Sequence, residues 1–169
     1  MYREYKKKVA IIGAGPSGLV SVKYAVENDL APVVFERSST IGGLWAPENK
    51  RSAAWDGLTA NVSFYGMAFS DHTYPEKSPI FSGKKEIFNY LTYYMIKFDL
   101  EKYIKFNTEI IEAKKSDDKW QLTFQTQGNK LQLEFFDFLI IASGLHETPH
   151  IPKFENQENF KGNIEFVES

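Results

Sequence analysis

The chain has 169 residues, a formal net charge of −2, 43% hydrophobic residues and no cysteine. This length suits one globular domain, and the weak charge argues against a nucleic-acid-binding protein, which usually carries a basic excess. The lack of cysteine excludes disulfide frameworks, thiolate metal sites and cysteine nucleophiles. His72, His146 and His150 show no metal-ligand spacing, and we expect them in loops or at the surface. No apolar run approaches the roughly 20 residues of a membrane helix, so we expect no membrane segment in this chain.

The first 57 residues are predicted to form a strand, a helix, a second strand and a loop. An unbroken, β-branched apolar run predicts a buried strand at Lys8–Ile12. Apolar residues near helical spacing predict a helix at Ser17–Asn28. The run LAPVVFER predicts a second buried strand that ends at Glu36. The glycines and the proline within Arg37–Gly57 indicate a loop.

The remaining residues are predicted to form a helix, a meander and a returning strand. Gly83–Asp99 carries its apolar residues on one face and is predicted to be helical. Polar stretches then separate three β-rich runs, which predict an antiparallel meander: Ile104–Lys114, Lys119–Thr126 and Lys130–Phe135. FDFLIIASG predicts a third apolar strand, and Leu145–Ser169 is polar and irregular. This order predicts an α/β fold, a Rossmann-like parallel βαβ core with an inserted helix and an antiparallel β-meander.

The stretch VAIIGAGPSGL contains a G-x-G-x-x-G pattern between the first strand and the first helix. Gly13 permits a tight turn, Gly15 lets the backbone approach a pyrophosphate, and Gly18 lets the helix pack close to the strand. The helix N-terminus offers free N–H groups and the positive end of a dipole to an anion. Pro16 suits the first helical position, and the Ser17 hydroxyl is available to a phosphate. The pattern predicts a dinucleotide site, with a purely structural turn as the alternative.

Glu36 favours a dinucleotide over other phosphate ligands. It lies 36 − 18 = 18 residues past Gly18, near the roughly 20 expected for the acid that binds an adenosine ribose. Arg37 is compatible with a 2′-phosphate, but the Glu36 carboxylate beside it would repel one. A P-loop would require lysine after Gly18, where Leu19 stands.

Two adjacent glycines follow the acid in RSSTIGGLW, which is unexpected for a plain NAD domain. They suggest a backbone that lies against a bulky flat group, with Leu44 and Trp45 beside it. The alternative is an ordinary glycine turn next to a core tryptophan.

From about Val9 to Gly162 the chain resembles the N-terminal FAD-binding part of the flavin-containing monooxygenases. The resemblance rests on GAGPSGL, FERSSTIGGLW, LTANVS, MAFSD, YP, FDLEKYIKFNT, IIASG and FKG, in this order. It implies that Asn61 is the family's active-site asparagine, which contacts the flavin and NADP. The full set of cofactor-binding residues that the resemblance implies is Gly13, Ala14, Gly15, Pro16, Ser17, Gly18, Glu36, Gly43, Leu44, Trp45, Ala60 and Asn61.

The resemblance also implies an activity. In that family NADPH reduces FAD, and the reduced flavin adds O₂. The resulting C4a-hydroperoxide gives one oxygen to a soft nucleophilic N or S centre of a small molecule. We therefore expect a monooxygenase of the N,N-dimethylaniline type that uses FAD and NADPH. We expect it in the cytoplasm, or on the cytosolic face of the endoplasmic reticulum if a longer form carries an anchor.

The chain departs from the family pattern at several positions. Ala60 stands where the family often has threonine, Phe64 where many members have lysine, and Ser143 where threonine is common. No second G-x-G follows Gly18, so we expect residues 1–169 to form an FAD-binding domain that is truncated at its C-terminus and lacks the NADPH-binding domain. Two alternatives remain open. One is a truncated FAD-binding module or inactive remnant without NADPH turnover, and the other is a related two-dinucleotide flavoprotein such as a ketone monooxygenase.

Overall fold

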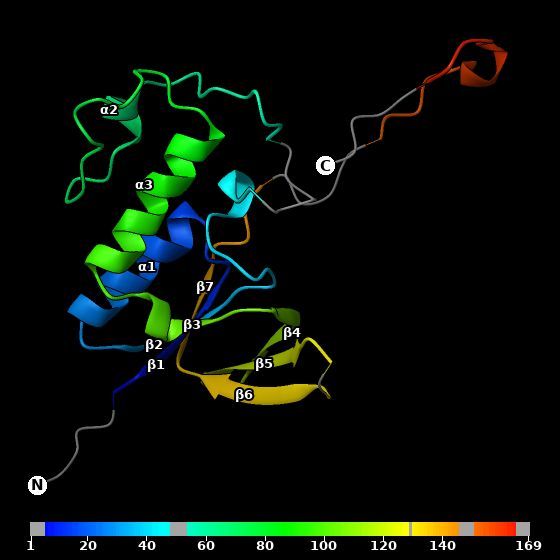
Figure 1. Cartoon of the computed structure of the whole chain (residues 1–169). Coiled ribbons are helices and arrows are strands. Elements are labelled where there is room, and N and C mark those ends of the chain that lie inside the picture. The colour runs from blue at the N-terminus through cyan, green and yellow to red at the C-terminus, as the bar shows by residue number, and fades with distance from the viewer. Residues whose placement is uncertain (1–5, 48–53, 129, 146–150, 165–169) are drawn as a thin grey trace, which may run out of the picture.

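The computed structural model describes residues 6–47, 54–128, 130–145 and 151–164, and Figure 1 shows two sheets with helices packed against one of them. The α-helices are α1 (Pro16–Glu27), α2 (Phe64–Met67) and α3 (Lys84–Lys97). The 3₁₀ turns are η1 (Gly43–Trp45), η2 (Glu101–Tyr103) and η3 (Gln157–Asn159). The strands are β1 (Lys8–Ile12), β2 (Ala31–Phe35), β3 (Ile104–Lys105), β4 (Thr108–Ser116), β5 (Lys119–Thr126), β6 (Gln132–Phe136) and β7 (Phe138–Ile141).

The larger sheet is parallel and has the strand order β3-β2-β1-β7. Val9 of β1 lies opposite Pro32 of β2 on one side and Phe138 of β7 on the other. The returning strand therefore pairs with the first strand of the chain. This arrangement confirms the predicted Rossmann-like core with its inserted helix and meander.

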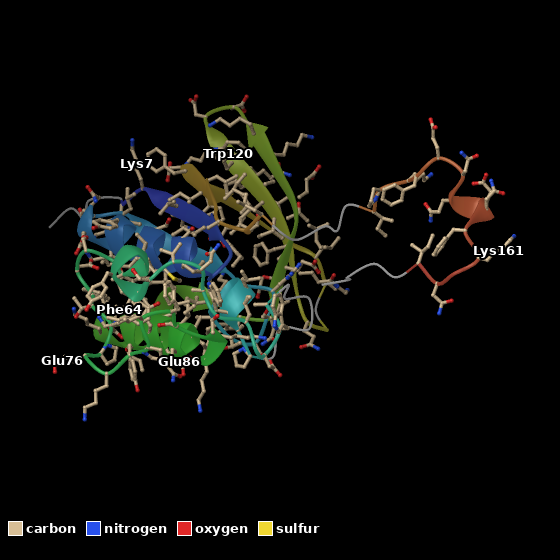
Figure 2. All side chains as sticks on the ribbon, turned by 90° about the horizontal axis from the view of Figure 1, so that it is seen from above. Lys7, Phe64, Glu76, Glu86, Trp120 and Lys161 are labelled. Atoms are coloured by element: carbon tan, nitrogen blue, oxygen red, sulfur yellow. The ribbon has the colours of Figure 1, made fainter. Side chains whose placement is uncertain are left out.

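The two faces of the parallel sheet carry different layers, because strand side chains alternate between faces. Val9, Ile11 and Val34 belong to the apolar core that includes α1 and α3. Ala10 and Phe35 belong to a second core that they share with the meander strands. Seen from above, the labelled Trp120 of the meander and Phe64 of α2 lie on opposite sides of the molecule (Figure 2). The parallel sheet is thus covered by helices on one face and by the meander β4-β5-β6 on the other.

The prediction of a single strand over Ile104–Lys114 is wrong. Asn107 has a φ of +51°, and this left-handed residue divides the run into two strands. β3 joins the parallel sheet beside β2, whereas β4 begins the antiparallel meander. Asparagine tolerates this conformation better than most residues. The Asn107 N–H bonds the carbonyl of Ser38, which fixes the break next to the end of β2.

Residues 59–83, here called the 59–83 loop, are closed at their base by a bridge between Thr59 and Gly83. They contain only the short helix α2. Much of the loop packs on α3 through aromatic side chains. We call Phe69, His72, Tyr74, Tyr90 and Tyr94 the ring cluster. Within it, the Tyr74 and Tyr90 rings stack with centroids 3.9 Å apart and planes 4° apart.

Candidate functional site

Two glycines of the first loop are required by the backbone itself. Gly13 has a φ of +98°, and a Cβ there would lie 2.5 Å from the carbonyl oxygen of Ala142. A Cβ on Gly18 would lie 1.9 Å from the carbonyl oxygen of Gly13. Such distances are far below van der Waals contact. These two residues therefore let the turn between β1 and α1 close against β7.

Gly15 is different, because the protein leaves room for a side chain there. Its φ is −74°, and the only heavy atom within 4 Å of an added Cβ is the Cα of Gly43, at 3.8 Å. Gly43 has a φ of +56°, and a Cβ on it would lie 3.2 Å from the Gly15 Cα. Two stretches of bare backbone thus face each other at the start of α1.

The N-terminus of α1 is open toward the same space. Pro16 occupies the first helical turn, and no side chain caps the helix. The first helical hydrogen bond runs from the Leu19 N–H to the Gly15 carbonyl. An uncapped helix N-terminus carries partial positive charge and is a ready anion site.

Glu36 follows β2 and is 7% exposed. Its carboxylate accepts two backbone hydrogen bonds, from the Ala14 N–H at 2.7 Å and from the Ser38 N–H at 2.8 Å. Each oxygen accepts one of these bonds, so each retains acceptor capacity for a further donor such as a ribose hydroxyl. Glu36 therefore joins the glycine loop to the loop after β2.

Replacement of Glu36 by alanine is expected to lower the free energy of unfolding by about 2–4 kcal/mol, because the buried Ala14 N–H and the half-buried Ser38 N–H would lose their partner. Urea denaturation of the purified chain measures this change. Glu109→Ala is the matched control, since Glu109 is an exposed acid that lines the same cleft. Equal stability of the two variants would show that the Glu36 hydrogen bonds do not hold the loop.

These loops open into a cleft of about 870 Å³ at the carboxyl ends of β1, β2 and β7. The cleft lies where β2 and β7 leave β1 on opposite sides, which is the usual position of ligands in open parallel sheets. Eight of the predicted residues line it: Gly13, Gly15, Pro16, Ser17, Glu36, Gly43, Leu44 and Trp45. Ala14 and Gly18 are buried within the β1–α1 turn.

Ala60 and Asn61 lie outside the residues that line the cleft. They belong to the 59–83 loop, where the Ala60 N–H bonds the carbonyl of Ser82 at 2.9 Å. Ala60 packs on the apolar core that also receives Trp45. Asn61 is exposed. Its assignment to the active site therefore stays a prediction.

Part of the cleft wall was missed by the sequence reasoning. The segment Thr108–Ile110 of β4 and the segment Ile141–Leu145, which begins with the last residue of β7, both line it. The glycine turn after the third apolar strand was a usable signal for the second segment, because parallel strands end at the same edge. No comparable signal marked the first, since the break at Asn107 was hidden inside one apparent strand.

Among the described residues no group of His, Cys, Asp or Glu side chains could hold a metal ion. His72 lies in a loop as predicted, but its ring packs in the ring cluster, 4.9 Å from the ring of Tyr90. Burial, and then the nearby charge of Lys97, lower the pKa of His72. His146 and His150 lie outside the described residues.

The lowered pKa of His72 gives a prediction for pH dependence. The unfolded chain takes up this proton near pH 6.5, whereas the folded chain resists it. Stability should therefore fall as the pH drops below about 6.5 toward the folded pKa. Asp71 opposes the shift and Lys97 strengthens it. In urea titrations from neutral to mildly acid pH, His72→Gln should lose less stability than the original chain. Parallel curves for the two proteins would contradict this role.

A glycine turn, an open helix N-terminus and an acid after the second strand meet at the switch point of a parallel sheet. These features define the class of the protein, an α/β domain of the Rossmann-like, dinucleotide-binding type. The family described as flavin-binding monooxygenase-like matches residues 6–168. The chain belongs to this family.

The curated relatives agree with this assignment. The chain is 39% identical over 168 residues to flavin-containing monooxygenase 5 of Mus musculus, covering 93% of this chain and 31% of the relative. It is 40% identical over 167 residues to dimethylaniline monooxygenase [N-oxide-forming] 2 of Cavia porcellus, covering 92% and 31%. The chain thus spans about a third of the length of these relatives.

Solved structures share the fold. S-allyl-L-cysteine S-oxygenase of Allium sativum superposes with a TM-score of 0.83 at 23% identity, over 94% of this chain and 41% of that one. Tmm of a Pelagibacter strain gives 0.81 at 26% identity, over 92% and 40%. In the part of the chain that the structure describes, no helix has the length and apolar character to cross a membrane.

Proposed function

We propose that this chain binds FAD and forms the FAD-binding part of an NADPH-dependent monooxygenase. The observation that carries the proposal is the bare backbone of Gly15 opposite Gly43, at the uncapped N-terminus of α1. A pyrophosphate can approach this backbone closely because no side chain intervenes. A cleft of about 870 Å³ also falls in the range expected for cofactor sites.

Each part of the cleft is proposed to bind one part of FAD. The loop from Gly13 to Gly18 and the α1 N-terminus would receive the pyrophosphate. Glu36 would accept the ribose hydroxyls, and Leu44 and Trp45 would pack beside the flavin. FAD supplies the redox chemistry with NADPH and O₂ when it is bound. The chain contributes binding, orientation and exclusion of water.

Asn61 is proposed to act as a hydrogen-bond donor at the reacting end of the cofactor. A side-chain amide donates without changing its charge, and a fixed donor stabilises developing negative charge more than water does. The substrate would be a small molecule with a soft nucleophilic N or S centre. Support for an N centre comes from the curated relatives, one of which is named as N-oxide-forming.

A second candidate is an FAD-binding module without NADPH turnover. In these 169 residues the G-x-G-x-x-G pattern occurs once, at the loop where FAD is proposed to bind. Both candidates require FAD at the same cleft. NADPH consumption in a sample that has bound FAD separates them.

The test is the absorption spectrum of the purified chain after incubation with FAD and desalting. Retained flavin bands are expected, and ADP should compete with FAD, because ADP carries the adenosine ribose and a diphosphate and lacks only the flavin end of the cofactor. A folded chain that retains no flavin and binds no ADP would contradict the proposal. Circular dichroism of the same sample establishes that the chain is folded.

A further inference from the structure

A turn at Phe69–His72 is tied to helix α3 at several points. The Tyr90 hydroxyl accepts a hydrogen bond from the Phe69 N–H at 2.7 Å and donates one to the His72 carbonyl at 2.8 Å. The Lys97 ammonium donates to the Asp71 carbonyl at 2.7 Å. Three bonds from one helix thus fix four consecutive residues, which include the FSD part of the MAFSD motif.

Helix α1 holds the same turn through a nearly buried charge. The Lys23 side chain is 9% exposed, and its ammonium lies 2.6 Å from the Asp71 carboxylate and 3.0 Å from that of Glu27. It also lies 5.1 Å from the centre of the ring of Phe98, the residue directly after α3. An apolar residue at this position would avoid desolvating a charge. A lysine here therefore indicates a specific requirement for its contact with Asp71.

Ring contacts continue from the turn toward Asn61. Tyr74 stacks on Tyr90, and Phe64 lies 5.5 Å from Tyr74 between ring centroids. Phe64 stands three residues after Asn61, and its N–H bonds the carbonyl of Ile80. These contacts join Phe64, and with it the segment that carries Asn61, to α3.

We infer that Lys23 and Tyr90 are positioning residues. Through the turn at Phe69–His72 they fix the position of Asn61 relative to α1. Helix α1 begins at the proposed pyrophosphate site, so the tie would fix the distance between the two ends of the cofactor site. The importance of this distance for catalysis rests on the proposed function. The tie itself does not, because it needs no ligand.

Hydrogen–deuterium exchange on the full chain tests the tie without FAD. Lys23→Met keeps an unbranched side chain without the charge, and Tyr90→Phe keeps the ring without the hydroxyl. Both should speed amide exchange in the 59–83 loop about 10-fold and leave β1 and β5 unchanged. Lys85→Met and Tyr93→Phe, at exposed positions of α3, should change neither. Unchanged exchange in the loop, or an equal rise in loop and sheet, would overturn the inference.

A second readout separates positioning from general loosening. With FAD bound, Lys23→Met should keep the original dissociation constant, while its visible flavin spectrum should shift toward that of Asn61→Ala. A spectrum identical to the original one in Lys23→Met, or in Asn61→Ala, would overturn the link to the flavin. If the original chain binds no FAD, the proposed function fails, and the exchange measurement alone decides whether Lys23 and Tyr90 position the loop.

Discussion

Gly15→Ala is expected to weaken FAD binding about 100-fold, because the methyl group would hold the pyrophosphate away from two or so N–H donors. The fold should tolerate the change. Gly15 already has a φ that any residue adopts, and an added Cβ would have one neighbour within 4 Å, the Gly43 Cα at 3.8 Å. A larger branched side chain, in Gly15→Val, should abolish binding.

Titration with FAD, followed by flavin fluorescence, measures the loss, and urea denaturation checks that stability is retained. Gly57→Ala is the control for the loss of a glycine, because Gly57 is exposed and an added Cβ would meet the Trp55 ring at an ordinary 3.7 Å. Undiminished FAD binding by Gly15→Ala would remove the main support for the proposed site.

Gly18→Ala should lower the stability of the fold, whereas Gly15→Ala should weaken ligand binding. A Cβ added at Gly18 would lie 1.9 Å from the Gly13 carbonyl oxygen and 3.0 Å from the carbonyl carbon. Both atoms are backbone, so no side chain can turn aside to relieve the clash. We expect a loss of about 3 kcal/mol in the free energy of unfolding, at the upper end of the usual range for overpacking.

Gly15 and Gly18 lie three residues apart in one motif, but their alanine variants should differ in stability. Urea denaturation without ligand should show a large loss for Gly18→Ala and little for Gly15→Ala. Equal stabilities would mean that the turn between β1 and α1 relaxes more easily than its backbone contacts indicate. In that case the third glycine of the motif would not be required for helix packing.

Local patterns predicted those parts of the molecule that depend on neighbouring residues. The bounds of β1 and β5 match the predicted runs, since an unbroken apolar run and a β-rich run between polar stretches are local signals. The acid at Glu36 was found by its spacing from the glycine pattern. The family assignment was also reached from motifs in order.

Contacts between distant segments were not predictable in the same way. The Thr108 N–H bonds the Glu36 carbonyl, and this bond brings β4 to the cleft. No residue pattern near Thr108 in the sequence indicates this hydrogen bond. The N–H groups that Glu36 binds were likewise invisible, because spacing identifies an acid but not its protein partners. The tie between Lys23 and Asp71 joins residues that only the tertiary fold brings together.

The pairing of β1 with β7 has a consequence for how the protein is made. The Lys8 N–H bonds the Asp137 carboxylate across 129 positions of sequence. A ribosome adds about 5–20 residues per second, so it needs on the order of ten seconds after β1 to synthesise β7, the strand that follows Asp137. Until then the backbone N–H and C=O groups on one edge of β1 lack a partner strand. By that time β2 can already pair with the other edge of β1, and α1 can cover one of its faces. Late pairing of such distant strands is slow because a long chain segment must close first. During this interval the emerging chain therefore presents an unpaired strand edge, to which other strands can pair.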